Sequence, residues 1–171
     1  MIKTAELLEY KDKLTTIDEL KLIRAKLGKL VITTGSYSII HPDHIRYLET
    51  AKSLGDTLVL SLDSDFYVQK RKGIEKQIVN FEARACLLSY FQCVDYVIKS
   101  EGDDIGTINA LQPDVYVQSE STTQESLEAK KPIVNAVEEN GGDFYMLPAE
   151  NKFGLSTSSI IKKVLNNYNE K

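Results

Sequence analysis

The segment LVITTGSYSIIHPDHIRYLETA, residues 30–51, joins a strand pattern to a helix pattern through a glycine turn. Its first part, residues 30–34, is a short run of apolar and β-branched residues, which is typical of a buried strand. Gly35 interrupts that run, and apolar residues then recur at helical spacing from Ile45 to Leu54. The segment therefore predicts a strand, a turn and a helix, with the turn at the carboxyl end of the strand.

This turn carries groups that suit an anion. Backbone N–H groups at the start of a helix are free, and the helix dipole adds positive potential there. His41 and His44 lie three residues apart across the predicted helix start, where protonated imidazoles would add charge-assisted donors. They are the only two histidines among 171 residues, so we interpret the pair as functional. The backbone N–H groups of Thr34 and Gly35 are expected to complete a phosphate site.

Strand and helix patterns alternate along the rest of the chain. Strands are predicted at 57–62, 93–100, 114–118 and 144–147, and helices at 18–27, 80–91, 105–111, 131–140 and 156–168. Residues 66–76, which include several basic residues, are predicted to form a loop. The polar residues 119–130 are predicted to form a loop or a mobile lid. The alternation predicts an α/β fold, a Rossmann-like doubly wound parallel sheet of about five strands flanked by helices. Residues 1–28 are expected to form an N-terminal helical extension and 29–171 the main domain.

Composition and charge restrict the class of partner. The net charge is −4 and the sequence pI is about 5.3, so no global basic field attracts nucleic acid. An anionic ligand would have to be captured by a local patch. No apolar run approaches the roughly 20 residues of a membrane-spanning helix, and the N-terminal residues lack the apolar core of a signal peptide. We therefore expect a cytoplasmic protein that binds neither nucleic acid nor membrane.

The motif at residues 33–48, TTGSYSIIHPDHIRYL, resembles the T-N-G-C-F-D-x-x-H-x-G-H-x-x-x-L signature of the cytidylyltransferase-like nucleotidyltransferases. Further blocks resemble that family in the same order: LSLDSD, KRKG, FEARACLLSYFQCVDYVI, QPDVYV, VEENGGDFYMLP and GLSTSSII. The chain is most similar to the heptose 1-phosphate adenylyltransferase domain of lipopolysaccharide core biosynthesis, and it is also similar to glycerol-3-phosphate cytidylyltransferase. The resemblance implies transfer of AMP or CMP from ATP or CTP to a small phosphorylated metabolite such as a sugar 1-phosphate, with release of pyrophosphate. It also implies a homodimer.

The resemblance and the local chemistry together assign candidate site residues. The catalytic residues are predicted to be His41, His44 and Lys72. The turn and the start of the last helix are predicted to bind the nucleotide through Thr33, Thr34, Gly35, Ser36, Tyr37, His41, His44, Ser156, Thr157 and Ser158. The acceptor is assigned to Asp65, Lys72, Lys76 and Arg84, with Lys70 and Arg71 as auxiliary cations. No metal ligand is identified, but Mg²⁺ is expected because it bridges nucleotide oxygens with few protein ligands.

Ordinary structural roles remain open for two of these assignments. Arg84 could equally be a solvated helix residue. One hydroxyl of the group from Ser156 to Ser158 could simply cap the last helix.

Four positions depart from the family pattern. Asp43 replaces the glycine between the histidines, Ser38 replaces an aspartate, and Thr34 replaces an asparagine. Gln118 stands where the family has a lysine after the fourth predicted strand. An aspartate beside a phosphate repels it unless the carboxylate turns away or meets a cation. These departures leave an alternative open, a catalytically impaired homologue that binds a nucleotide and regulates.

Overall fold

The strand β2 (Leu30–Gly35) lies in the interior of a parallel sheet, hydrogen-bonded to β3 on one side and β5 on the other. The computed structural model describes residues 13–120, 124–148 and 152–169. Within them the sheet has six strands in the order β1-β4-β3-β2-β5-β6. The other strands are β1 (Leu14–Thr15), β3 (Thr57–Asp63), β4 (Tyr96–Ser100), β5 (Val115–Ser119) and β6 (Asp143–Leu147). The predicted Rossmann-like α/β fold is confirmed.

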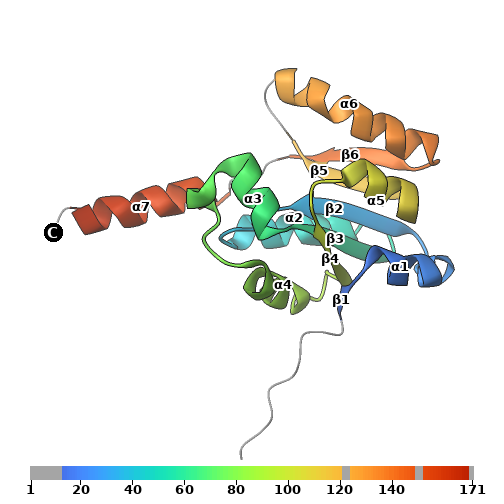
Figure 1. Ribbon diagram of the computed structural model, residues 1–171, viewed down its shortest axis with the longest axis horizontal. Helices are drawn as coiled ribbons and strands as arrows, with labels where there is room; N and C mark the ends of the chain where they lie inside the picture. The colour runs from blue at the N-terminus through green and yellow to red at the C-terminus, as the bar shows by residue number, and fades with distance from the viewer. Residues whose placement is uncertain (1–12, 121–123, 149–151, 170–171) are drawn as a thin grey trace, which may run out of the picture.

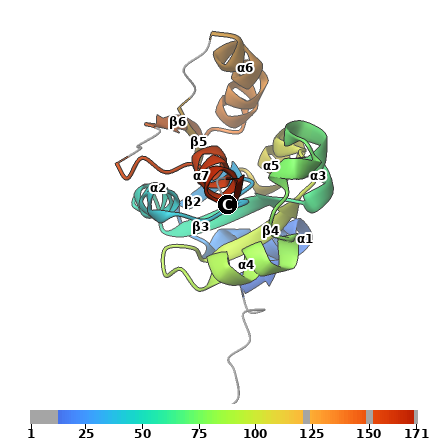
Figure 2. The same cartoon turned by 90° about the vertical axis from the view of Figure 1, so that its left-hand side faces the viewer.

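Helices cover both faces of this sheet (Figures 1 and 2). They are α1 (Ile17–Ile23), α2 (Pro42–Lys52), α3 (Asp65–Lys72), α4 (Phe81–Ser89), α5 (Asp104–Leu111), α6 (Gln124–Glu139) and α7 (Thr157–Asn169). Short 3-10 helices follow at Arg24–Lys26 and Ile74–Lys76. Among the described residues, no helix combines the length and the apolar composition needed to cross a membrane.

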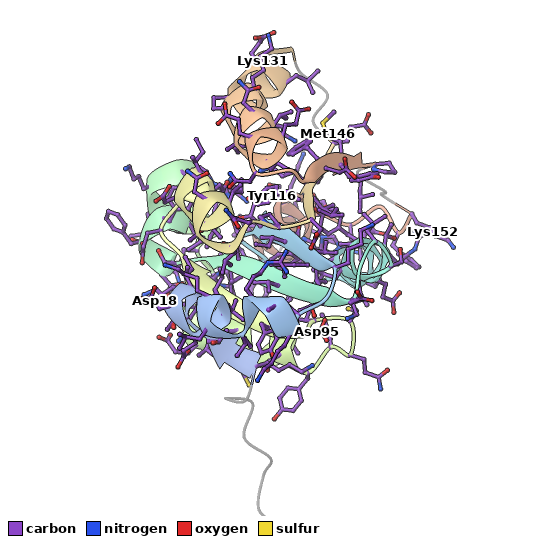
Figure 3. All side chains as sticks on the ribbon, turned by 90° about the vertical axis from the view of Figure 1, so that its right-hand side faces the viewer. Asp18, Asp95, Tyr116, Lys131, Met146 and Lys152 are labelled. Carbon is purple, nitrogen blue, oxygen red and sulfur yellow. The ribbon has the colours of Figure 1, made fainter. Side chains whose placement is uncertain are left out.

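The alternation of side chains along each strand builds two cores. Val31 and Leu60 point to the face covered by α2 and α4, where Leu48 and Leu88 are fully buried. The opposite face is covered by α1, α5 and α6, and its core includes Ile32, Val59, Tyr116, Leu20, Ile108 and Val137. Tyr116 lies inside the body of the molecule in Figure 3. Both faces of the parallel sheet are therefore sealed, and its ligands must bind at its carboxyl edge.

Residues 1–12 of the predicted N-terminal helical extension lie outside the described residues, and residues 13–28 differ from the helical prediction in two details. Leu14–Thr15 forms a strand that pairs in parallel with β4, an edge pairing too short to leave a sequence pattern. Helix α1 begins at Ile17, one residue before the predicted start, because Thr16 and Glu19 form a reciprocal capping box. Leu20 is fully buried in the core, whereas Leu22 is 86% exposed.

Both predicted loops contain helix. Residues 65–72 form α3, which Ser64 caps by accepting a hydrogen bond from the Tyr67 N–H. The apolar pattern of the sequence does not reveal this helix, because Val68 is its one buried residue. Helix α6 begins at Gln124 rather than near Lys131, because it continues through Pro132. An internal proline removes one helical hydrogen bond, so the sequence pattern favours a helix start there instead.

Candidate active site

The turn after β2 is held in an unusual backbone conformation. Tyr37 has φ +48°, in the left-handed region that non-glycine residues rarely adopt. Its ring is buried and folds back over Gly35, where a β-carbon would lie only 2.5 Å from the ring atom Cε2. Glycine is therefore required at position 35 for this close approach. The ring centroid of Tyr37 also lies 4.9 Å from that of His44, so the turn and the start of α2 form one packed unit.

The two histidines stack on each other at the start of α2. His41 is the N-cap residue with extended backbone, and Pro42 occupies the first helical position, where a missing N–H costs nothing. The imidazole centroids are 3.8 Å apart with 29° between the planes. The pKa of His44 is lowered to about 4, mainly by burial and then by the charges of His41 and Lys72, against an opposing effect of Asp43. Burial also lowers the pKa of His41, against an opposing effect of Asp43. Both rings are thus neutral near pH 7.

A buried carboxylate lies between them in the sequence. The Asp43 side chain is only 5% exposed, and neither oxygen has a hydrogen-bond partner in the described part of the chain. The nearest guanidinium nitrogen, Nη1 of Arg46, is 4.0 Å from Oδ1, an ion-pair distance too long for a hydrogen bond. Both carboxylate oxygens of Asp43 can therefore still accept hydrogen bonds at a position next to the histidines.

Polar groups at the ends of β2 and β3 form the floor of the site. Asp63 is almost fully buried and accepts hydrogen bonds from Ser36 Oγ at 2.6 Å and Arg71 Nη2 at 2.5 Å. Burial lowers the pKa of the neighbouring Lys72, Arg71 lowers it further, and Asp63 raises it. Lys72 has no ion pair among the described residues, so its ammonium is free to bind an added anion.

Together these groups line one cavity of about 1090 Å³ at the carboxyl edge of the sheet. It brings together most of the predicted site residues from distant parts of the sequence: Thr34, Gly35, Ser36, Tyr37, His41, His44, Lys72, Lys76, Ser156, Thr157 and Ser158. The auxiliary Arg71 lines it as well, and Lys70 does not. The volume is at the upper end of the range usual for ligand pockets, large enough for a nucleotide and a second small substrate.

Besides Lys70, three predicted residues do not line this cavity: Thr33, Asp65 and Arg84. Thr33 is buried in the sheet and donates its hydroxyl hydrogen bond to the Val117 carbonyl at 2.9 Å. Arg84 is 2% exposed, and its Nη2 pairs with Asp65 Oδ1 at 2.7 Å. Its Nη1 donates to the Ser36 carbonyl at 2.5 Å. In this structure the ion pair of Arg84 with Asp65 stabilises the turn after β2, through the hydrogen bond from Arg84 to the Ser36 carbonyl.

The start of α7 is organised by serines. The Ser159 N–H donates to Ser156 Oγ at 3.0 Å, and the Ser156 N–H donates to Ser159 Oγ at 2.8 Å. Ser156 is therefore the cap of the helix, the ordinary role considered for one hydroxyl of this group. Thr157 and Ser158 line the cavity, and Lys76 Nζ lies 3.5 Å from Ser158 Oγ.

The cavity also contains residues that the sequence did not single out. Arg46 and Tyr47 follow one turn after the histidine motif on α2, so helical spacing alone could have indicated them. Asp104 comes from the start of α5, and burial followed by the Asp63 charge raises the pKa of its carboxyl. Lys130 reaches the cavity from α6 and donates to the Ser119 carbonyl at 2.7 Å. It supplies a cation near Gln118, where the family lysine is missing.

Metal ligands are sparse in this site. Among the described residues, no three histidine, cysteine or acidic side chains cluster closely enough to hold an ion by themselves. Mg²⁺ needs only one or two protein carboxylates when phosphates supply the remaining oxygens. Asp104 offers such a carboxylate at the cavity, so the residues present fit a nucleotide-bound Mg²⁺ rather than a resident metal.

The comparison with protein families agrees with this geometry. The model of the Cytidylyltransferase-like family matches residues 32–163. This chain belongs to that family. The match begins in β2 and ends in α7, so it includes the histidine pair, Lys72 and the serines of α7. The family predicted from the sequence is confirmed, and its members are of nucleotidyltransferase type.

Curated relatives indicate which members of the family this chain resembles. The chain is 35% identical over 148 residues to the bifunctional protein HldE of Trichlorobacter lovleyi, covering 86% of this chain and 29% of that protein. It is 36% identical over 160 residues to HldE of Geobacter metallireducens, covering 93% and 31%. The chain thus spans about a third of the length of these relatives.

Solved structures show the same fold. A lipopolysaccharide core biosynthesis protein from Thermoplasma volcanium superposes with a TM-score of 0.57 at 26% identity, covering 71% of this chain and 95% of that one. The lipopolysaccharide-core branch of the predicted resemblance is therefore confirmed. A pantoate-beta-alanine ligase from Francisella tularensis has a TM-score of 0.60 at 14% identity, covering 84% and 70%, which shows the fold alone.

Proposed function

We propose that this chain transfers AMP from ATP, or CMP from CTP as the second choice, to a small phosphorylated metabolite such as a sugar 1-phosphate. The observation that carries the proposal is the stacked pair His41 and His44, which faces the same cavity as Lys72 and the start of α7. Two anions must meet in such a reaction, and this cavity is lined by Arg71, Lys72 and Lys76 as well as by the starts of α2 and α7. ATP is favoured by the resemblance to the adenylyltransferase domain.

The proposed chemistry is an in-line displacement at the α-phosphorus. A phosphate oxygen of the acceptor forms a new bond to that phosphorus, while the bond to the oxygen that bridges to the β-phosphate breaks. Pyrophosphate leaves with the bonding electrons. The protein contributes mainly position and charge stabilisation, because the reacting groups need little covalent help.

Each part of the cavity has a role in this proposal. His41 and His44 donate hydrogen bonds to oxygens of the reacting phosphates, where charge builds in the transition state. Removing one such donor costs roughly 10²–10³-fold in other enzymes. Lys72 holds the acceptor phosphate, and the backbone of Thr34 and Gly35 lies against the nucleotide. Bound Mg²⁺ would neutralise phosphate charge, with Asp104 as the protein carboxylate available to it.

The setting of the enzyme is part of the same proposal. A homodimer is expected from the resemblance, and α7, which extends away from the sheet in Figure 1, exposes Val164, Leu165 and Tyr168 on an apolar side. A cytoplasmic location is expected because nucleoside triphosphates are the proposed substrates. Sedimentation of the purified chain tests the first expectation, and fractionation of the cells that make it tests the second.

The proposal is tested by following phosphorus directly. Purified protein is incubated with Mg²⁺, ATP or CTP, and a panel of sugar 1-phosphates, and ³¹P NMR records the products. The proposal predicts equal amounts of pyrophosphate and a nucleoside diphosphate sugar, in which a new phosphoanhydride bond joins the two phosphates. A regulatory homologue would instead show nucleotide-dependent thermal stabilisation of about 2.7 kcal/mol at a hundred times Kd, and no nucleoside diphosphate sugar with any acceptor. Neither binding nor turnover with any nucleotide would contradict both functions.

A further inference from the structure

Three residues at the start of α2 bury polar atoms that lack a hydrogen-bond partner in the described part of the chain. These atoms are Nδ1 of His41, Nδ1 of His44, and both carboxylate oxygens of Asp43. Leaving a buried polar group unpaired costs about 1–3 kcal/mol, and more when it is charged. Buried polar groups in native proteins are nearly always paired, so this cluster needs an explanation.

The unpaired atoms are chemically complementary. An ionised carboxylate only accepts hydrogen bonds, and its two oxygens match the two Nδ1 atoms in number. The three residues occupy the N-cap, second and third positions of one helix, and the two rings already lie stacked. Asp43 lies between the two histidines in the first turn of the helix, so its carboxylate is the acceptor that this turn offers to both Nδ1–H groups. Arg46, at 4.0 Å, adds charge on the other side of the carboxylate without a hydrogen bond to it.

The burial of Nδ1 also fixes which nitrogen meets a ligand. Both histidines line the cavity while Nδ1 is buried, so Nε2 is the nitrogen left for the cavity. A neutral imidazole carries one proton, and the hydrogen bond at one nitrogen decides the state of the other. A carboxylate at Nδ1 would keep the proton there and would make Nε2 the basic position.

We propose that Asp43 is a positioning residue that holds the Nδ1–H groups of His41 and His44, so that Nε2 of each takes up a proton when phosphate binds. The imidazolium then lies between two anions, Asp43 and the nucleotide, which stabilises its charge. The ligand-bound half of this inference rests on the proposed function. The family signature has glycine at this position, so the signature itself does not account for this arrangement.

The electrostatic surroundings of the pair are consistent with this role. Asp43 is the group that raises the pKa of both histidines, whereas burial lowers both values. His41 and Lys72 oppose protonation of His44, and Arg46 is the other cation near the carboxylate. Negative phosphates that neutralise Lys72 would therefore favour protonation of the pair.

Two variants separate charge from hydrogen bonding at this position. Asp43→Asn keeps an accepting oxygen and removes the charge, and Asp43→Gly removes both. Glu49→Gln is the matched control, because it removes one carboxylate from the exposed side of the same helix. With only two histidines in the chain, ¹⁵N-histidine labelling gives two imidazole signals that report tautomer and pKa without any activity.

In wild-type protein without ligand, we expect both neutral imidazoles to carry the proton on Nδ1. Asp43→Gly should move it to Nε2, and both Asp43 variants should lower the histidine pKa values by about one unit. Glu49→Gln should match wild type. Identical tautomers and pKa values in wild type, Asp43→Asn and Asp43→Gly would overturn the inference. If Asp43→Gly does not fold, as judged by its amide spectrum, the pKa values in Asp43→Asn decide.

A second measurement tests the coupling to phosphate. Calorimetric titration of Mg²⁺ with α,β-methylene-ATP, in two buffers of different ionisation enthalpy, counts the protons taken up on binding. Wild type should take up between one and two protons at pH 7.5, and Asp43→Gly clearly fewer. Binding without proton uptake in wild type would overturn the coupling. If the analogue does not bind wild type, the proposed function fails, whereas the ligand-free tautomers still decide the role of Asp43.

Discussion

Replacing Arg84 by methionine separates support of the turn from contact with a ligand. Arg84 is 2% exposed, and its guanidinium donates to the Ser36 carbonyl at 2.5 Å, Asp65 Oδ1 at 2.7 Å and the Val79 carbonyl at 2.9 Å. Breaking a buried ion pair by removing one partner typically costs 3–5 kcal/mol. The Asp65 side chain is 32% exposed, so water replaces part of the loss and the lower end applies, about 3 kcal/mol.

Urea unfolding of Arg84→Met should therefore show a lower free energy of unfolding with an unchanged denaturant slope. The melting temperature should fall by roughly 6–12 °C for a chain of this length. Lys72→Met is the matched control, because Lys72 lines the cavity and has no ion pair among the described residues. It should leave the free energy of unfolding nearly unchanged. Arg84→Met with wild-type stability but weakened substrate binding would refute the supporting role and restore the sequence-based assignment to the acceptor.

Three further predictions concern the site itself. Because the folded pKa of His44 is about 4 against an ordinary 6.5, the unfolded chain binds more protons between these values. The ligand-free protein should lose roughly 1–3 kcal/mol of stability as pH falls from 6.5 to 4, and His44→Gln should flatten that loss; equal pH dependence in both proteins would contradict it. Lys72→Met should raise the KM for the acceptor phosphate by roughly 10–100-fold with little change in nucleotide Kd, and an unchanged KM would remove Lys72 from the acceptor site. Excess EDTA should abolish pyrophosphate release and added Mg²⁺ should restore it; turnover that persists in EDTA would contradict the expected Mg²⁺.

The sequence predicted the centre of the fold well because the pattern changes sharply there. Between Leu30 and Ala51 the apolar period changes from strand to helix at a glycine, and the sheet edge places that turn at the ligand site. By contrast, α3 has one buried residue, Val68, and no apolar stripe to detect. The helix depends instead on the Ser64 cap, with Asp65 in its first turn and basic residues in its last.

The roles of some site residues could not be predicted, because the residues that they contact lie far away in the sequence. The position of Arg84 on a helix does not reveal whether it meets water or a buried carbonyl, and its partner Ser36 lies 48 residues away. Lys130 was hidden for the same reason, since only the packing of α6 brings it to the cavity. Asp43 could be recognised as a departure from the family pattern. That both of its oxygens are buried and unpaired is visible only in three dimensions.

The most direct test of the account is the single-turnover rate of pyrophosphate release by His44→Ala, measured at saturating Mg²⁺, nucleotide and acceptor, beside the nucleotide Kd. We expect a rate roughly 10²–10³-fold below wild type, because a donor to the transition state is lost. The Kd should stay within about threefold of wild type, because ground-state binding keeps the other donors. His41→Ala should behave in the same way. A variant that releases pyrophosphate at the wild-type rate would contradict the claim that the stacked histidines stabilise nucleotidyl transfer.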